Sequence, residues 1–420
     1  MQRMAAVASS ARLKFGLFIA PFHPVGENPT LAYERDLDLV QRLDGLGFDE
    51  AWFGERHSCG WETIPAPDLM IAAAAMRTRR LKLGAAVVSL PFHHPFNVAE
   101  RFAFLDHLTG GRVMLGLGPG ALPADAHLYG VPFEKQRAMM NEGLDVILRL
   151  YRSPEPVTHD GSYFKLRDAR LQVRPLQNPH LPIGIACGGG VNGFMQAGKH
   201  GIWPISAGMF SSEGFTDLKK KWGVLERAAQ AAGRTSDRAD WRLSIPIHLA
   251  DSREQALSEI RAGANRWIRD YYCAALGAAF LFQERPDQTL EELTIDRLVE
   301  RGTVIVGTPD DAIAAIEQLI EHSGGFGAVL AMANDWASHA ATTHSYDLLA
   351  RYVMPYFQGT LAGPQAAYDY ALENGADLLR QSISSAMKAT RGADVKPTRS
   401  AEPTTDGLRP EPEKHAEPEK

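Results

Sequence analysis

The sequence contains few cysteines and no spacing typical of a metal site. Its 420 residues include three cysteines, Cys59, Cys187 and Cys273, which lie far apart in the chain. No CxxC pair or Cys/His ligand spacing occurs, so the sequence predicts no structural zinc and no other bound metal. A disulfide framework is not expected in a reducing compartment.

Positive charge and long apolar runs are also scarce. The formal net charge is −6, and the body of the chain has no basic block of the kind that binds nucleic acid. No apolar run approaches the roughly 18 residues that a membrane helix needs. The first residues, MQRMAAVASSARLK, lack an apolar core of signal-peptide length. We therefore expect a cytoplasmic protein that binds neither nucleic acid nor a membrane.

What is present is a repeated pattern of short apolar runs, each followed by a segment of helical periodicity. Because the runs are apolar throughout, they predict strands buried on both faces, as in parallel sheets. The expected strands are residues 14–20, 49–54, 81–88, 112–117, 181–187, 201–206, 242–250 and 327–332. Eight such units in order predict a (β/α)8 barrel, and the alternative is an open doubly wound sheet.

The pattern also predicts how the chain is divided. The barrel is expected to span residues 13–358, after a flexible N-terminus over 1–12. Residues 151–180 interrupt the pattern with several prolines and a turn signal at Asp160-Gly161, which predicts a hairpin or lid-like insertion. A helix is expected over 359–391. Residues 392–420 are mostly Pro, Glu, Lys, Thr and Ser, the composition of a disordered tail.

Polar and flexible residues gather just after four of the expected strands. In parallel α/β folds, sites are built at these strand ends. The segments are residues 54–58, 89–97, 116–123 and 188–193. The last of them precedes a helix, where backbone N–H groups can receive a phosphate, although such a turn is also common in tight packing. The segment GLGPG at 116–120 lacks the spacing of a dinucleotide fingerprint, so a mononucleotide-sized cofactor is expected.

Five motifs in order add a family resemblance to this pattern. They are KFGLFIAPFH, WFGERHSCGWET, AAVVSLPFHHPFNVAE, LDHLTGGRVMLGLGPG and AGKHGI. On these motifs the chain resembles the bacterial luciferase-like flavin-dependent monooxygenases, in the branch of limonene monooxygenase-like and alkanal monooxygenase-like proteins. The resemblance is in good register over residues 14–206 and looser as far as 357.

The resemblance implies an activity and its partners. Such enzymes take reduced FMN from a separate flavin reductase and react it with dioxygen to form a flavin 4a-hydroperoxide, which oxygenates an organic substrate. A small apolar substrate is implied here, of terpenoid, alicyclic or aldehyde-like chemistry, together with a homodimer. Two alternatives stay open: a deazaflavin-dependent oxidoreductase of the same superfamily, and a non-catalytic flavin-binding protein.

The resemblance also implies which residues hold the flavin. Ala86 and Val87 fall where relatives carry a non-prolyl cis peptide beneath the flavin ring. Pro119 stands where the luciferases proper have a phosphate-binding arginine, so that charge is missing. The remaining residues implied around the phosphate chain are Gly118, Gly120, Arg137, Gly189, Gly190, Val191, Asn192 and Gly193.

The catalytic assignment is carried by a triplet, Glu55-Arg56-His57, at the position of a Glu-His-His pattern in relatives. His57 is expected to act as an acid or base, because an imidazole titrates near neutral pH. Arg56 would stabilise a flavin anion or the hydroperoxide, and Glu55 would orient its neighbours. The residues expected to wall a dry substrate pocket, unless they only pack the core, are Phe18, Trp52, Trp61, Phe92 and His94.

Overall fold

The computed structural model describes residues 12–188, 190–207, 217–285 and 287–392. The expected flexible N-terminus, apart from residue 12, and the expected tail beyond 392 lie outside these residues. The chain divides into two units, Met1–Thr360 and Leu361–Lys420. The first unit holds the barrel.

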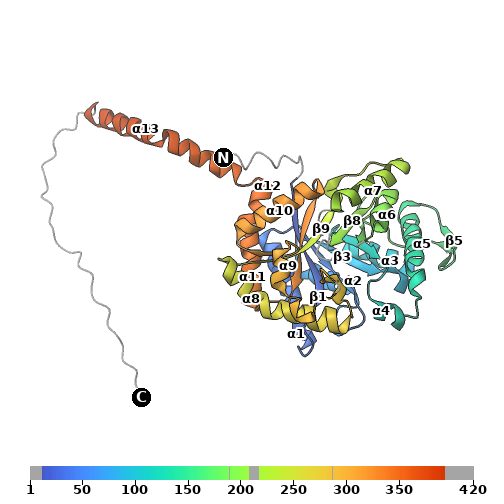
Figure 1. The fold of residues 1–420 in the computed structure, drawn as a ribbon. Helices are drawn as coiled ribbons and strands as arrows, with labels where there is room; N and C mark the ends of the chain where they lie inside the picture. The colour runs from blue at the N-terminus through green and yellow to red at the C-terminus, as the bar shows by residue number, and fades with distance from the viewer. Residues whose placement is uncertain (1–11, 189, 208–216, 286, 393–420) are drawn as a thin grey trace, which may run out of the picture. The chain divides into compact units, whose positions relative to one another are not determined.

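Eight parallel strands form a closed ring (Figure 1). In ring order they are β1 (Lys14–Phe22), β2 (Glu50–Phe53), β3 (Lys82–Ser89), β4 (Val113–Gly118), β7 (Ile183–Cys187), β8 (Trp203–Ala207), β9 (Arg242–Leu249) and β11 (Ala328–Asn334). Strand β11 pairs with β1, and β8 pairs with β9, so the ring of eight strands is closed; a ninth strand, β10 (Ile305–Gly307), pairs with β9 outside this ring. The prediction of a (β/α)8 barrel is confirmed, and the open-sheet alternative is wrong.

Alternation along each strand separates two apolar layers. In β1, Phe15, Leu17 and Ile19 belong to the large cluster between the strands and the surrounding helices. The alternate residues of each strand point into the barrel. There, Trp52 of β2 and Met114 of β4 form part of a smaller buried cluster. The apolar runs in the sequence therefore reflect burial on both faces of each strand.

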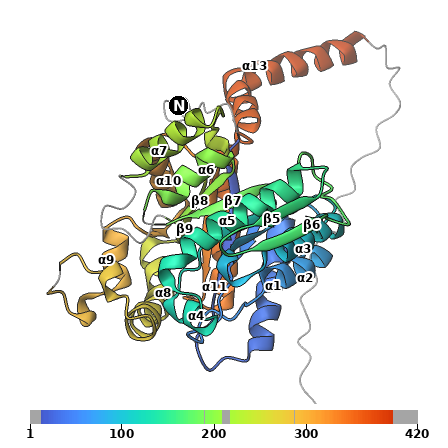
Figure 2. The ribbon, with the colours of Figure 1, turned by 90° about the vertical axis from the view of Figure 1, so that its right-hand side faces the viewer.

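Helices surround the ring on its outside (Figures 1 and 2). They are α1 (Pro29–Leu46), α2 (Pro67–Arg77), α3 (Pro95–Leu108), α5 (Phe133–Arg152), α6 (Asn192–His200), α7 (Leu218–Ala231), α8 (Arg253–Arg266), α10 (Pro309–Ser323) and α11 (His339–Leu348). Several begin with proline, which suits a first turn whose N–H groups lack helical partners. The sequence also predicts a helix over residues 212–233; it corresponds to α7, and residues 212–216 lie outside the described residues.

Three additions interrupt the regular units. The predicted hairpin is present as β5 (Val157–Asp160) and β6 (Lys165–Ala169), which pair antiparallel beside α5 (Figure 2). A short helix, α4 (Pro123–Leu128), follows β4. After β9, α8 continues as a π-helix, η5 (Trp267–Ala275), and α9 (Ile295–Glu300) and β10 (Ile305–Gly307) follow it. These additions contribute residues next to the ends of the strands.

The second unit contains one long helix, α13 (Ala362–Gly392), in the segment where a C-terminal helix was expected. Within the described parts of the chain, no helix combines the length and the apolar character needed to cross a membrane.

Candidate active site

A buried carboxylate lies just beyond the carboxyl end of β2. Glu55 is 1% exposed, and its Oε1 lies 3.1 Å from His57 Nε2 and 3.0 Å from His93 Nε2. The second carboxylate oxygen lies 3.1 Å from the same His93 nitrogen. His93 directly follows the short turn η2 (Leu90–Phe92) at the end of β3. Two neighbouring strand ends therefore bring one carboxylate and two imidazoles together.

The two imidazoles keep this carboxylate ionised. Burial alone would raise the pKa of Glu55, but the hydrogen bonds and charges of His57 and His93 outweigh burial and lower it. A buried carboxylate that accepts two N–H groups fixes which ring nitrogen of each histidine carries the proton. Each imidazole thus presents its other nitrogen, Nδ1, away from Glu55.

His57 also connects this group to an exposed aromatic residue. The Tyr129 hydroxyl lies 3.3 Å from His57 Nδ1, and the two ring centroids are 4.9 Å apart. Tyr129 stacks in parallel on Phe92 at 4.7 Å. Burial and the nearby carboxylates of Glu55 and Asp125 raise the pKa of Tyr129. A hydrogen-bonded chain therefore runs from Tyr129 through His57 and Glu55 to His93.

Asp125 fixes the loop that carries His57. This buried carboxylate of α4 accepts hydrogen bonds from the Ser58 hydroxyl at 2.5 Å and from the His57 backbone N–H at 3.3 Å. The loop after β2 and the segment after β4 are thereby joined at the site.

Arg56 points elsewhere. Its guanidinium forms an ion pair with Glu62, whose side chain is 2% exposed, and Tyr271 of η5 hydrogen-bonds to the same carboxylate. Burial alone would lower the pKa of Arg56, but the negative charge of Glu62, together with smaller contributions from nearby acidic groups, outweighs burial and raises this pKa. Since Glu62 neutralises the guanidinium, the expected role of Arg56 in stabilising a flavin anion has no support in this geometry. Arg56 instead joins the β2 loop to η5.

The ends of β3 and β4 pair closely with each other, and β3 leads directly into the turn that precedes His93. The Ala86–Val87 peptide is cis, as the resemblance implied, and the β3–β4 register shifts between Ala85 and Val88. A Cβ on Gly118 would lie 2.5 Å from Val87 Cγ2, so the close approach of the two strands requires glycine there. Gly120 follows with a positive φ of 83°.

The turn before α6 presents backbone to solvent. Gly190 and Val191 are exposed, Asn192 and Gly193 are half-buried, and Gly189 lies outside the described residues. In the part of the chain that is described, no side chain caps the start of α6. Its first N–H groups therefore point outward, as a phosphate site requires. Arg137 is exposed near the start of α5, and Gln136 Nε2 donates to the Pro119 carbonyl at 2.9 Å.

Two of the expected pocket residues lie elsewhere. Trp52 is fully buried inside the barrel and donates to Glu50 at 3.0 Å, so it packs the core beneath the site. His94 caps α3 by accepting from the Phe96 N–H at 3.3 Å and faces Phe164 of the hairpin segment. Its neighbour His93 faces the site instead, because adjacent residues of an extended segment point in opposite directions.

The other three expected pocket residues lie nearer the mouth. Phe92 packs on Tyr129 and His57. Trp61 lies 5.7 Å from Tyr271, ring centroid to ring centroid, and Phe18 is half-buried between two apolar clusters.

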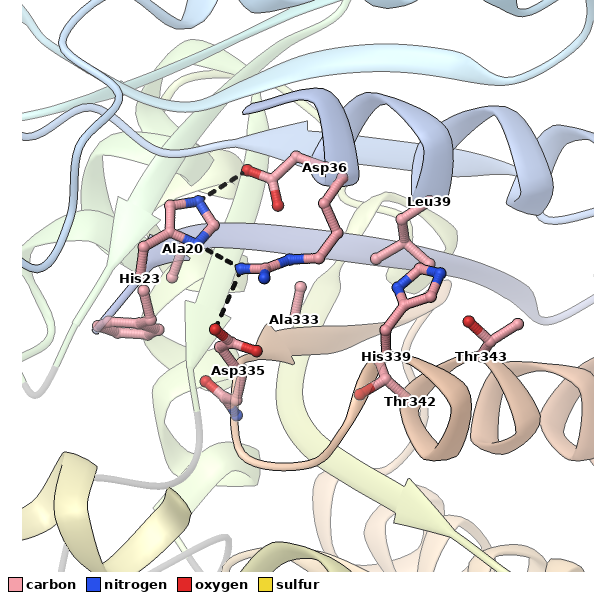
Figure 3. Close-up of a pocket in the computed structure, with 12 residues that line it drawn as sticks. Ala20, His23, Asp36, Leu39, Ala333, Asp335, His339, Thr342 and Thr343 are labelled. Carbon is pink, nitrogen blue, oxygen red and sulfur yellow. Dashed lines mark hydrogen bonds and ion pairs between the residues drawn. The ribbon is translucent and has the colours of Figure 1, made fainter. Parts of the chain in front are cut away.

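Two groups of side chains have the composition of metal ligands. Ligand atoms of Glu55, His57 and His93 lie within 4.8 Å of one another, but both imidazoles already hydrogen-bond to the carboxylate. The second group contains His23 and Asp335, beside a hollow between α1 and α11 (Figure 3). Arg35 donates to Asp335 at 3.1 Å and lies 3.3 Å from His23 Nδ1, so a cation already occupies the centre of that group.

Comparison with known proteins identifies the family. The family model for luciferase-like monooxygenases matches residues 13–326, which is well over half of the chain. The chain belongs to the luciferase-like monooxygenase family. It is therefore an enzyme of the monooxygenase class.

Named members of the luciferase-like monooxygenase family match along almost their whole length. The chain is 44% identical to 4-hydroxyprotoasukamycin monooxygenase of Streptomyces nodosus subsp. asukaensis over 86% of this chain and 97% of that protein. It is 38% identical to limonene 1,2-monooxygenase of Rhodococcus erythropolis over 90% and 96%. A solved structure of the oxygenating constituent of 3,6-diketocamphane monooxygenase from Pseudomonas putida, in complex with FMN, superposes with a TM-score of 0.71 at 25% identity, covering 82% of this chain and 98% of that one.

The sequence left some residues of this luciferase-like site unassigned. Tyr129 and Asp125 lie in α4 or directly after it, and no expected motif contains them. Their signal is weak, because a single tyrosine or aspartate in a short helix has no distinctive spacing. His94 was expected in the pocket, but the turn geometry places its neighbour His93 against Glu55 instead.

Proposed function

We propose that this protein is an FMN-dependent monooxygenase that uses reduced FMN and dioxygen to oxygenate a small apolar organic substrate. The observation that carries the proposal is the buried Glu55, which holds His57 and His93 at the barrel mouth, next to the end of β3, where Val87 packs closely against the backbone of Gly118. Ionisable groups held next to a backbone surface suit a flat cofactor with reactive ring atoms.

The residues present fit a mononucleotide flavin. Ala86 and Val87 would support the ring, and Gly118 and Gly120 would lie along the chain that carries the phosphate. The uncapped start of α6, with Gly190 and Asn192 before and within it, would receive the phosphate through backbone N–H groups. When bound, the reduced flavin supplies the electrons that activate dioxygen.

The side chains supply positioning, proton transfer and exclusion of water. Glu55 orients both imidazoles, and His57 can move a proton at Nδ1, where Tyr129 already makes a hydrogen bond. Phe92 and Tyr129 stack on each other, and both contact the His57 ring edge-to-face, which leaves the His57 side chain only 11% exposed. A shielded site protects a reactive oxidant from decay before the substrate reacts.

The partners and the cofactor source follow from the same proposal. The sequence carries no dinucleotide fingerprint, which supports supply of reduced FMN by a separate reductase. The names of two matched relatives include limonene and 4-hydroxyprotoasukamycin, and the aromatic residues near the mouth suit terpenoid or alicyclic molecules. We include in the proposal a homodimer located in the cytoplasm.

Binding titrations test the cofactor part of this proposal. The full chain is titrated anaerobically with reduced FMN and, separately, with a reduced deazaflavin, and dioxygen uptake is then followed with a limonene-like substrate. Tight binding of reduced FMN and substrate-dependent oxygenation are expected. Binding of the deazaflavin alone would show a hydride-transferring oxidoreductase, and FMN binding without any turnover would show a flavin-binding protein; either result contradicts the proposal.

A further inference from the structure

Helix α13 carries an apolar row that runs along one face. The row residues are Tyr368, Leu372, Ala376, Leu379, Ile383 and Met387, each three or four positions after the one before it. This spacing places them on one side of a helix with 3.6 residues per turn. All are exposed, and Leu372, Leu379 and Met387 are 66%, 62% and 61% exposed. A contiguous apolar face of this kind marks an interaction surface.

The charged residues of α13 are segregated along one flank of that row. Asp369, Glu373 and Asp377 each directly follow a row residue in the first half of the helix. Arg380 and Lys388 occupy the same flank in the second half. The flank therefore changes from acidic to basic near the middle of the helix.

The opposite flank has a different composition. The residues that directly precede row positions are Ala367, Ala371, Gly375, Leu378, Ser382 and Ala386. They carry no charge, and apart from Leu378 they are small, so a partner helix can approach closely on that side. The helix thus has one neutral flank and one flank of two opposite charges.

Contacts within the helix leave the row uncovered. Arg380 makes an ion pair with Asp377, three residues earlier, and both side chains are largely exposed. Asp369 accepts from Gln365 at 2.9 Å. Exposed pairs of this kind contribute at most about 1 kcal/mol, so both carboxylates remain available to a partner.

We propose that α13 pairs antiparallel with α13 of a second copy of this chain. When two identical helices pack antiparallel, each flank faces the same flank of its partner, so the acidic half meets the basic half. In a parallel pair the charged flank would face the neutral one, and the charges would find no partners. Charges that flank an apolar seam determine the orientation of such pairs.

One axial register of the antiparallel pair brings the apolar row residues opposite one another and also places opposite charges close together. With the two-fold axis beside Leu379, Leu372 of one copy lies opposite Met387 of the other, and Ala376 lies opposite Ile383. The same register brings Asp369 near Lys388 and Asp377 near Arg380 of the second copy. Asp369 and Asp377 each gain a basic neighbour in this register, whereas Glu373 lies opposite the neutral Ser384.

Disulfide trapping in the full-length chain tests the orientation. The Leu379→Cys variant is expected to form a covalent dimer rapidly on mild oxidation, because the two copies of this position meet at the axis. The Leu372→Cys variant is the matched control, since its two copies would lie about 20 Å apart at 1.5 Å per residue. The parent chain, with its three native cysteines, gives the background. Equal trapping at both positions would show a parallel pair, and trapping at neither would show that α13 does not pair with itself; each result overturns the proposal.

A charge exchange provides a second test that does not depend on cysteine. In sedimentation equilibrium, Asp369→Lys and Lys388→Asp are each expected to weaken self-association about two- to tenfold, and the double variant should recover it. These positions are about 28 Å apart along one helix, so recovery requires contact between copies. An additive loss in the double variant would contradict the proposal. So would monomeric chains that bind vesicles of phosphatidylcholine and phosphatidylglycerol, since the row would then bind lipid.

Discussion

At the scale of single residues, the site depends on one carboxylate that two imidazoles share. The Glu55 carboxylate accepts hydrogen bonds from Nε2 of both His57 and His93. Because the pKa of Glu55 is lowered, the carboxylate stays negatively charged. The negative charge fixes both histidines in one protonation pattern. It also leaves His57 Nδ1 directed at Tyr129, which connects the buried group to solvent.

Replacing that charge should therefore cost activity more than stability. A Glu55→Gln amide can accept from one imidazole only, and it presents an N–H group to the other. Hydrogen bonds to charged groups contribute about 1.5–3 kcal/mol, so we expect oxygenation to fall about 10- to 100-fold. Steady-state turnover of the parent and Glu55→Gln enzymes with reduced FMN, measured at a series of pH values, gives the size of this loss.

A matched variant separates this effect from a general loss of a Glu–His pair. Glu142 makes a similar pair with His159 at 3.1 Å beside the hairpin, and neither residue belongs to the Glu55–His57–His93 cluster. Glu142→Gln should leave turnover within about twofold of the parent. A Glu55→Gln enzyme with parental turnover at every pH would disprove the role given to Glu55.

At the scale of elements, the cofactor surface depends on how closely β3 and β4 approach at their ends. A Cβ at Gly118 would lie 2.5 Å from Val87 Cγ2, whereas a Cβ at Gly190 would meet nothing within 4 Å. Gly118→Ala should therefore reduce the free energy of unfolding by about 1–3 kcal/mol, as overpacking commonly does. Denaturant unfolding measures this change.

Two further variants control that experiment. Gly190→Ala should leave the free energy of unfolding nearly unchanged, because its Cβ has open space. Adding Val87→Ala to Gly118→Ala should restore part of the loss, because the clashing methyl is removed. If Gly118→Ala is as stable as Gly190→Ala, the strand ends are less tightly packed than described.

At the scale of the whole molecule, a buried ion pair crosses the barrel interior. Arg242 of β9 donates to Glu50 of β2 at 2.7 Å, although two strands separate β9 from β2 in the ring. Both side chains are almost fully buried, and the Arg242 guanidinium lies over the Trp203 ring at 3.5 Å. Burial alone would raise the pKa of Glu50, but the charge and hydrogen bond of Arg242 outweigh burial and lower this pKa.

This pair should make the barrel sensitive to acid. A lowered folded-state pKa means that the contribution of Glu50 to stability is present above its ordinary pKa of 4.5 and is lost as the pH falls through the folded value. Glu50→Gln leaves Arg242 buried without a counter-charge, and we expect a loss of about 3–5 kcal/mol at neutral pH. Thermal unfolding measured from pH 8 to well below pH 4.5 reports both effects.

A double variant checks the physical cause. Glu50→Leu combined with Arg242→Met removes both charges, and it should be more stable than Glu50→Gln at neutral pH. If the double variant is less stable than the single one, the loss does not arise from an unpaired buried charge.

The order of elements could be predicted from the sequence because burial on both faces of a barrel strand leaves an unbroken apolar run. The hairpin was predictable too, from its turn signal at Asp160-Gly161. The direction of single side chains was not. Trp52 points into the barrel and Arg56 pairs with Glu62 six residues later, and neither follows from residue type. Tertiary contacts decide these orientations, and no local pattern reports them.

The central claim is that this barrel oxygenates an organic substrate with reduced FMN. The direct measurement is mass spectrometry of products formed from isotopically labelled dioxygen, with reduced FMN supplied by a flavin reductase and a panel of terpenoid and alicyclic substrates. We predict one labelled oxygen atom in the product, and much less product from the Glu55→Gln enzyme. Oxidised substrate without label, or consumption of reduced FMN with no oxygenated product from any substrate in the panel, would contradict the account.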